Sequence, residues 1–580
     1  MSKVFQYMKP YTLMIICTVA LLTVEAACAL ILPAYMADII NKGVMPGNIP
    51  FIWRTGITML LITIFSTLVA VTTSYFAARI GTGVAGDLRA AVFKKVLSFS
   101  SAEMNRFSSS SLITRTTNDI IQVQLVLIMG MRLLVYAPIL GTGGIIRALE
   151  RDVYMSWIVA VATFVMVACM VALFFVVMPR YKKLQTFIDR LNLVSRENLS
   201  GILIVRAFST QRFEKKRFEE ANRNLTNTSL FVDQAFATLT PVILLVLNVT
   251  ATVIVWVGAR RASSFHIEIG DIFAFLQYGM LIIFAFLMVG VMFIYLPRAV
   301  VCAGRIKEVL ETRSSLQYKA DAEIFPEDFK GIVEFRNVTF RYPDSSEDDD
   351  NTLEDVSFTA EPGKTTAIIG ATGSGKSTIF KLFLRFYDAT SGGVYFDNIN
   401  VKDVRKEALL DKIGYIPQKA LLFSGSIRSN LMYSDKTATE ERLKDAADTA
   451  QAAAFIEARE DGYDSNVAQG GANLSGGQKQ RISIARALVK NAPIYLFDDS
   501  FSALDLKTDA LLRTALKKKT GKSTIVVIAQ RISTIMDADH IVVLDNGKVV
   551  GQGTHFELMS SCEVYREIAA SQLTEKEAGL

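Results

Sequence analysis

Six long apolar stretches in the first half of the sequence constrain the fold more than any other feature. A helix needs about 20 apolar residues to cross the roughly 30 Å hydrocarbon core of a membrane. Stretches of that kind run over residues 11–40, 57–76, 123–146, 154–178, 235–257 and 272–295. Backbone polar groups find no water inside the membrane, so each stretch is expected to be helical. We predict an α-helical membrane bundle with six spans.

Basic residues are distributed unevenly around these stretches. The connections 77–122 and 179–234 are long and rich in Lys and Arg, whereas the other connections are short. Basic loops stay on the cytoplasmic side, so we expect both long connections there. They contain few helix breakers and should continue the spans as stalks, since a 45-residue helix reaches ~65 Å. A soluble domain is expected to act on the stalk turns near Ser100 to Ser111 and near Thr210 to Arg212.

The chain changes character after about residue 330, where charged residues become dense. We expect a transmembrane domain over residues 1–315, a linker over 316–330 and a soluble α/β domain over 331–580. The net charge of +6 does not imply a nucleic acid partner, because the basic residues cluster at the ends of the spans. The five cysteines form no CxxC pair, so neither a disulfide framework nor a metal site is indicated.

A glycine-rich loop indicates the chemistry of the soluble domain. The apolar run 365–369 predicts a buried strand, and a helical pattern over 379–386 follows the loop. The loop itself reads Gly370, Ala371, Thr372, Gly373, Ser374, Gly375, Lys376, Ser377, Thr378. Its backbone N–H groups are suited to wrap phosphates, while Lys376 meets the β and γ oxygens and Ser377 ligates Mg²⁺. This P-loop predicts binding of a nucleoside triphosphate with Mg²⁺.

A second apolar strand, residues 494–497, ends in Asp498. A carboxylate at the carboxyl end of a neighbouring parallel strand is the expected Mg²⁺ partner of a P-loop. Asp498 is therefore a candidate metal ligand beside Ser377.

The string Leu474, Ser475, Gly476, Gly477, Gln478 opens a predicted helix. A hydroxyl and two glycines at a helix N-terminus offer close approach and a favourable dipole to a γ-phosphate. The string resembles the signature motif of the ABC transporter superfamily. In that family the phosphate belongs to ATP held by a partner's P-loop, so the resemblance implies that this segment acts on the partner's ATP. Six spans followed by one such domain is the layout of exporter half-transporters.

Further motifs of that superfamily follow in order. Tyr342 resembles the aromatic residue that stacks on adenine. Gln418 resembles the residue that senses Mg²⁺ and contacts the stalks, which adds it to the expected metal ligands. The run Ser502 to Asp505 resembles the loop that crosses the dimer interface.

Two positions depart from the family pattern, and both concern hydrolysis. Asp499 stands where hydrolytic members usually carry Glu as the base for the attacking water, and Gln530 stands where they usually carry His. Retracting a base by about an ångström can cost on the order of 10²-fold in rate. An amide can bond a phosphate but cannot become a cation. We expect this chain's own site to bind ATP and hydrolyse it poorly.

The combined pattern resembles the degenerate-site subunit of heterodimeric bacterial multidrug ABC exporters. The resemblance implies an ATP- and Mg²⁺-dependent multi-pass protein of the bacterial plasma membrane, with its nucleotide-binding domain in the cytoplasm. It also implies a different half-transporter as partner and small amphipathic compounds as cargo. The alternatives are a homodimeric exporter with slow turnover, an exporter of lipid or peptide, and an ATP-sensing regulatory subunit that does not transport.

One charge lies in the middle of an apolar stretch. Glu25 sits inside the first span, where an ionised side chain costs roughly 2.5 to 3.5 kcal/mol unless it is paired or faces water. It is a candidate contact for a cationic substrate. The alternative is a carboxylate paired within the bundle or lying in water near the outer end.

Overall fold

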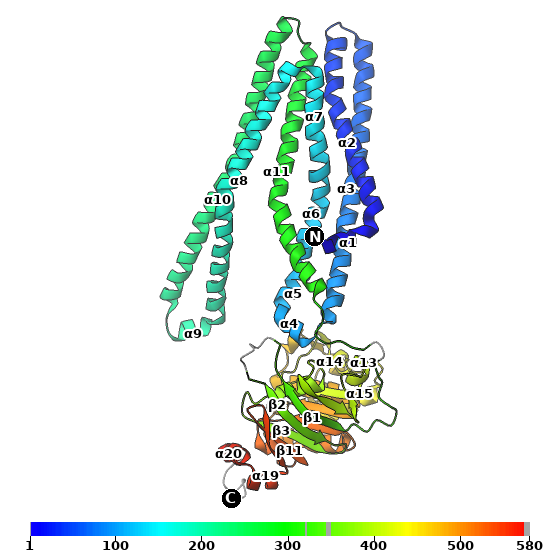
Figure 1. Ribbon diagram of the computed structural model, residues 1–580, viewed down its shortest axis with the longest axis vertical. Helices are drawn as coiled ribbons and strands as arrows, with labels where there is room; N and C mark the ends of the chain where they lie inside the picture. Colours follow the sequence, from blue (N-terminus) through cyan, green and yellow to red (C-terminus); the bar gives the residue numbers. More distant parts are fainter. Residues whose placement is uncertain (1, 320–321, 344–349, 573–580) are drawn as a thin grey trace. The chain divides into compact units, whose positions relative to one another are not determined.

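The computed structural model describes residues 2–319, 322–343 and 350–572, which group into two compact units. The first contains the residues up to Leu97 together with Ser110–Thr312. The second contains Ser98–Ser109 together with the described residues from Arg313 onward. Figure 1 follows the chain through both units.

The first unit is entirely helical. Within the described residues, six helical stretches are long and apolar enough to cross a membrane: Val4–Val44, Ile49–Leu97, Ser109–Arg151, Val153–Ser200, Gln211–Ser263 and Ile269–Glu311. The six-span prediction is thus confirmed. Its elements are α1 (Ser2–Met8), η1 (Lys9–Tyr11), α2 (Thr12–Asp38), η2 (Ile39–Val44), α3 (Ile49–Leu97), α5 (Ser109–Thr116), α6 (Asn118–Met131), η3 (Arg132–Tyr136), α7 (Ala137–Arg151), α8 (Val153–Ser200), α9 (Ile202–Ala207), α10 (Gln211–Ser263) and α11 (Ile269–Glu311).

The helices continue well beyond the apolar stretches. Helix α8 has 48 residues, which at ~1.5 Å per residue gives ~72 Å, more than twice the hydrocarbon thickness. Its first turn is capped by Asp152, whose Oδ1 accepts a hydrogen bond of 2.8 Å from the backbone N of Met155. Figure 1 shows α8 and α10 running side by side, with α9 at the turn between them.

Small residues let α2, α7 and α11 approach closely. A Cβ added to Gly144 would lie 2.7 Å from Ile282, and one added to Gly143 would lie 2.3 Å from Leu30. Both distances are shorter than carbon atoms tolerate, so each glycine leaves room for a facing side chain. Packing of this kind, together with interhelical hydrogen bonds, holds membrane helices together where water cannot drive association.

The second unit contains two main sheets. The larger has the order β12-β11-β3-β10-β9-β6, with β12 antiparallel and the other five strands parallel. The smaller is antiparallel, in the order β2-β1-β4-β5. The strands are β1 (Val333–Phe340), β2 (Leu353–Ala360), β3 (Thr365–Gly370), β4 (Ser391–Phe396), β5 (Ile399–Asn400), β6 (Ile413–Ile416), β7 (Gly425–Ser426), β8 (Asn466–Val467), β9 (Ile494–Asp498), β10 (Thr524–Ile528), β11 (His540–Asp545) and β12 (Lys548–Gly553).

Helices complete this α/β unit, as the sequence predicts. They are α4 (Ser101–Phe107), α12 (Lys376–Phe383), α13 (Lys406–Asp411), α14 (Ile427–Leu431), α15 (Glu440–Thr449), α16 (Ala453–Glu457), α17 (Gly476–Val489), α18 (Leu506–Lys519), α19 (His555–Ser561) and α20 (Glu563–Gln572), with short turns η4 (Gly462–Asp464), η5 (Gln469–Gly471) and η6 (Ile532–Thr534). Strand β3 faces a hydrophobic core on each side: Ala367 and Ile369 join one core, and Ile368 joins the other. Burial on both faces is typical of parallel sheets and explains its unbroken apolar run.

The short helix α4 belongs with the second unit although the helices on either side of it in the chain belong to the first. Ala102 is part of the core beside the smaller sheet, and Asn105 Nδ2 donates a hydrogen bond of 3.1 Å to the Tyr387 hydroxyl. Glu103 closes a capping box with Ser100 and accepts a 3.0 Å hydrogen bond from the backbone N of Ser315. These contacts fix the turn between α3 and α5 to the second unit.

Candidate nucleotide-binding site

The P-loop lies between β3 and α12, in the middle of the parallel sheet. Gly375 takes a φ of +96°, and a Cβ there would lie 2.6 Å from Leu353 and 2.9 Å from the Thr352 carbonyl. Only glycine accepts both the left-handed backbone and the close approach. The loop can therefore curl tightly and turn its N–H groups towards an anion at the start of α12.

Two side chains of the loop fit a bound phosphate. Lys376 Nζ donates to the carbonyls of Gly370 and Ala371, both at 2.7 Å, which places its charge inside the curl. Burial lowers the pKa of Lys376, an effect that the negative charge of Asp499 opposes, and an anionic phosphate would act in the same direction. Ser374 Oγ is buried and has no hydrogen-bond partner among the described residues. This donor set suits ATP.

Two adjacent carboxylates stand beside the loop at the end of β9. Asp498 and Asp499 are each 8% exposed. Burial, followed by the charge of Asp499, raises the pKa of Asp498 to about 6, while the Tyr415 hydroxyl and Lys381 oppose the rise. A divalent cation would favour the charged form, so Asp498 fits the Mg²⁺ role expected of it.

Both amides that the sequence places in the site converge on one oxygen. Gln530 Nε2 donates to Asp499 Oδ2 at 2.8 Å, and Gln418 Nε2 donates to the same oxygen at 3.2 Å. Asp499 itself has a φ of +46°, and its backbone N donates to the Ile528 carbonyl at 2.9 Å. The Asp499 carboxylate is thus held by two amides.

Tyr342 is held against the P-loop helix. Its hydroxyl bonds Thr378 Oγ1 at 2.9 Å and accepts a 3.0 Å hydrogen bond from Lys381 Nζ. Its ring packs edge-on against Tyr387, with centroids 5.3 Å apart. Stacking on adenine stays a prediction for this residue.

The signature segment caps a separate helix. Ser475 is the N-cap of α17 and forms a capping box with Gln478, in which Ser475 Oγ accepts from Gln478 N and Gln478 Oε1 accepts from Ser475 N. A Cβ at Gly476 would meet nothing within 4 Å, whereas one at Gly477 would lie 3.4 Å from the Ala503 carbonyl. Across the described part of the chain, no hydrogen bond joins this segment to the P-loop.

Neighbouring strands explain why distant motifs meet. β3, β10, β9 and β6 run parallel in this order, so their carboxyl ends carry the P-loop, Gln530, Asp498 and Gln418 to one edge of the sheet. The metal ligands expected from the sequence, Ser377, Asp498 and Gln418, all lie along this edge. Two further residues of the site were not predicted from the sequence: Tyr415, which bonds Asp498, and Lys381, which donates to the Tyr342 hydroxyl. No motif indicates either contact.

In the membrane unit, Glu25 is paired. Arg132 Nη2 donates to Glu25 Oε1 at 3.3 Å. Glu25 is 8% exposed, and its Oε2 is buried without a hydrogen-bond partner among the described residues. Arg132 opens the π-helical segment η3, a type of distortion that is frequent at functional sites.

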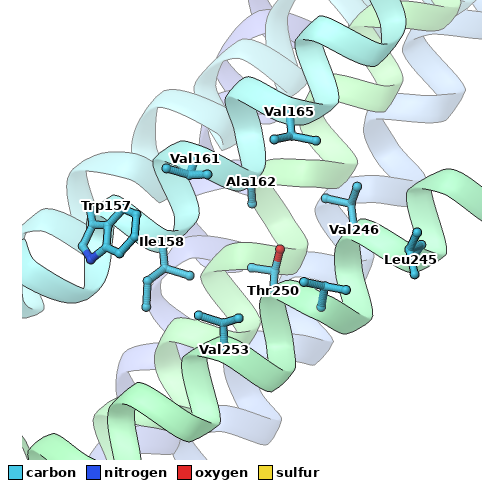
Figure 2. A pocket seen from close by; sticks show the side chains of 10 residues that line it. Trp157, Ile158, Val161, Ala162, Val165, Leu245, Val246, Thr250 and Val253 are labelled. Atoms are coloured by element: carbon cyan, nitrogen blue, oxygen red, sulfur yellow. The ribbon is translucent and has the colours of Figure 1, made fainter.

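Two apolar cavities lie between α8 and α10. The larger, of about 400 Å³, is lined by side chains from both helices that face one another in Figure 2, with the Thr250 hydroxyl among aliphatic groups. The second, of about 320 Å³, is lined in part by Cys169 and Met170. Neither is lined by Glu25.

The sequence was compared with family models. A model described as "ABC transporter" matches residues 353–502, which include the P-loop, the signature segment and both carboxylates. A second, described as "ABC transporter transmembrane region", matches residues 14–286. Each match falls within one of the two regions that the sequence analysis separates.

Similar proteins cover nearly the whole chain. An uncharacterized ABC transporter ATP-binding protein of Mycobacterium tuberculosis (strain CDC 1551 / Oshkosh) is 40% identical over 571 residues, 98% of this chain and 97% of that protein. An ATP-dependent lipid A-core flippase of Pseudomonas aeruginosa is 30% identical over 541 residues, 91% and 87% of the two chains. The structure of a bacterial Atm1-family ABC exporter with ATP bound matches with a TM-score of 0.78 and 25% identity, covering 97% of this chain and 99% of that chain.

Proposed function

Because this chain belongs to the ABC transporter family, with a transmembrane region and an ATPase domain, we propose that it is one subunit of a heterodimeric exporter. Its own P-loop forms a site that binds ATP and hydrolyses it poorly. Its Ser475 to Gln478 segment completes the active site on a different half-transporter. Closure of the two nucleotide-binding domains around ATP drives the cargo outward.

The hydrogen bonds at Asp499 carry this proposal. A general base must reach the attacking water and accept its proton. The Asp499 carboxylate is one methylene shorter than Glu, and its Oδ2 already accepts from Gln418 and Gln530. An oxygen that already accepts two hydrogen bonds is poorly placed to take a proton from water as well. The P-loop keeps every feature needed for binding, so the expected defect lies in hydrolysis alone.

The remaining residues have ordinary roles in this scheme. Ser377 and Asp498 would hold Mg²⁺, with Gln418 beside them, and the ion would neutralise part of the phosphate charge. Lys376 and the loop N–H groups grip the phosphates of this chain's ATP. Ser475 and its two glycines offer a helix N-terminus to the γ-phosphate of the partner's ATP.

The tip of the α8 and α10 pair supports the need for a partner. Leu199, Leu203 and Phe208 lie around α9 and are each more than three-quarters exposed. Neighbouring apolar side chains of this size at the far end of a helix pair mark a surface that another protein covers. We assign this surface to the second half-transporter.

The cargo is proposed to be amphipathic. The cavities between α8 and α10 would accept apolar groups, and Glu25 Oε2, which has no hydrogen-bond partner among the described residues, would accept a hydrogen bond from a polar or cationic group. A second candidate function is lipid export by a homodimer, because the Pseudomonas aeruginosa relative is named a lipid A-core flippase.

The decisive experiment measures ATP turnover of the purified pair after co-expression with candidate half-transporters. Ser475→Ala should lower turnover by about 10²-fold, because it removes a donor from the competent site. Lys376→Ala should leave a sizeable fraction, because it damages only the weak site.

A matched control separates the loss of a helix cap from the loss of a catalytic contact. The Thr439 hydroxyl accepts from the backbone N of Arg442 at the start of α15, as the Ser475 hydroxyl accepts from Gln478 N at the start of α17, where Gln478 adds a reciprocal bond. Thr439→Ala should leave turnover unchanged. Equal losses from Lys376→Ala and Ser475→Ala would instead favour a symmetric homodimer.

A further inference from the structure

The last helix of the described chain ends on the segment that carries Gln530. Gln572, at the end of α20, accepts a 2.9 Å hydrogen bond from the backbone N of Ile532 on its Oε1. Its Nε2 donates to the Gln530 carbonyl at 2.9 Å. One amide side chain therefore brackets residues 530–532 from both sides, 40 residues away in the sequence.

These two bonds satisfy backbone groups that have no regular partner. Strand β10 ends at Ile528, and the chain then turns through Gln530 into the short helix η6. The first N–H groups of a helix, such as that of Ile532, have no partner within the helix and depend on side chains or water. Arg513 serves the far side of the same turn, donating at 3.1 Å to the Ser533 carbonyl.

Gln530 is thus held at both of its ends. Gln572 holds its carbonyl, and Asp499 Oδ2 accepts from its side-chain Nε2 at 2.8 Å. Since the side chain starts from a backbone fixed by Gln572, a shift of that backbone moves the amide away from Asp499. The position of the amide depends on α20.

Helix α20 is anchored firmly enough to act in this way. Tyr565 and Ala569 are fully buried and lie in the same hydrophobic core as Ile532. The Tyr565 hydroxyl bonds His555 Nδ1 at 2.7 Å and so joins α20 to α19. Gln572 itself is exposed, which means that its substitution removes two polar contacts without opening a cavity.

We propose that Gln572 is a positioning residue for nucleotide binding at this chain's own site: it fixes the backbone of residues 530–532 and so holds the Gln530 amide where it can bond a γ-phosphate. The inference rests on the proposed function, which places Gln530 at the switch position of an ATP site. On this proposal, the end of α20 sets how strongly the site distinguishes ATP from ADP.

The test compares ATP and ADP affinity in the purified full-length chain by equilibrium dialysis with radiolabelled nucleotides. Gln572→Leu should weaken ATP binding roughly three- to tenfold, the effect of losing about one neutral hydrogen bond, and leave ADP binding unchanged. ADP has no γ-phosphate and does not meet Gln530. A merely structural role for Gln572 would move both affinities together.

Hydrogen exchange of the same protein measures directly whether the bond from Ile532 N to Gln572 is formed. The Ile532 amide should lose protection in Gln572→Leu and keep it in Gln572→Glu, which retains the acceptor but not the donor. Ser571→Ala is the matched control, because the Ser571 hydroxyl donates to the Ile568 carbonyl of its own helix at 2.8 Å and, among the described residues, to no other group. It should change neither readout.

Two results would overturn the proposal: an Ile532 amide equally protected in Gln572→Leu, or ATP and ADP affinities that fall together or not at all. Failure of the proposed function looks different. In that case the wild-type chain itself either binds no ATP or hydrolyses it briskly without a partner.

Discussion

In the proposed scheme, the carboxylate of Asp499 limits how fast this site hydrolyses ATP. Two amides donate to its Oδ2, and its backbone lies in the left-handed region, so the carboxylate is held in one orientation. Gln530 cannot become a cation, whereas histidine can. Asp499 and Gln530 therefore both differ from the residues usual in the family, and they are hydrogen-bonded to each other.

Restoring both residues should restore hydrolysis. Asp499→Glu together with Gln530→His extends the base by one methylene and replaces one of the amides that hold it. We expect turnover at this site to rise about tenfold or more. The measurement is single-turnover hydrolysis in the pair, with the partner's own P-loop lysine substituted.

Gln530→His alone serves as the comparison for this experiment. It leaves the short base in place, so it should give little gain. If the double variant showed no gain either, the weak turnover would have a cause outside Asp499 and Gln530.

Motif spacing placed the P-loop, Asp498 and Gln530 at the ends of predicted strands, and these strands are neighbours in one parallel sheet. It could not predict that Gln418 and Gln530 donate to Asp499. Those bonds join residues 81 and 31 positions apart and depend on how strands and turns are placed in space. Gln572 carried no signal at all, since an exposed glutamine at the end of a helix resembles any other surface residue.

Among the elements, α4 belongs to the second unit, whereas the helices before and after it in the chain belong to the first. Glu103 is its central residue: Oε2 accepts from Ser100 N at 2.8 Å and Oε1 from Ser315 N at 3.0 Å. Burial raises the pKa of Glu103, but the hydrogen bonds from Ser100 and Ser315 outweigh it and lower the pKa overall. An ionised Glu103 therefore holds α4 in place.

Glu103→Ala should loosen α4 without touching the nucleotide site. We expect a loss of about 1 kcal/mol in local stability, the usual value of a cap, and a loss of substrate-stimulated ATPase activity while basal activity remains. Stimulation is measured with the purified pair in vesicles. Glu103→Gln keeps one acceptor and should give an intermediate effect, whereas full stimulation in Glu103→Ala would show that α4 plays no part in coupling.

Hydropathy predicted the six spans because a membrane needs long apolar helices. The polar connections contain few helix breakers, and helices such as α8 and α10 continue through them. The grouping of Ser98–Ser109 with the second unit could not be predicted from the sequence. It depends on contacts of Ala102 and Asn105 with side chains far away in the sequence, and no periodicity predicts such contacts.

At the scale of the whole molecule, the proposed asymmetry makes this chain dependent on another. Purified alone, the chain should bind ATP but hydrolyse it at least about 10²-fold more slowly than the pair does. A competent site needs both a P-loop and a glutamate base, and this chain carries Asp499 at the position of the base. The measurement is steady-state ATPase activity before and after addition of the partner. Brisk hydrolysis by the chain alone, with two equivalent sites per dimer, would contradict the heterodimer.

The assignment of Ser98–Ser109 to the second unit means that the polypeptide passes between the two units three times, at Leu97, Ser109 and Thr312. A single proteolytic cut therefore cannot separate them. A fragment that starts at Arg313 would also lack Ala102 from its core and Asn105 from the Tyr387 hydroxyl. The second unit is therefore complete only with Ser98–Ser109, a segment that lies in the chain between two membrane helices.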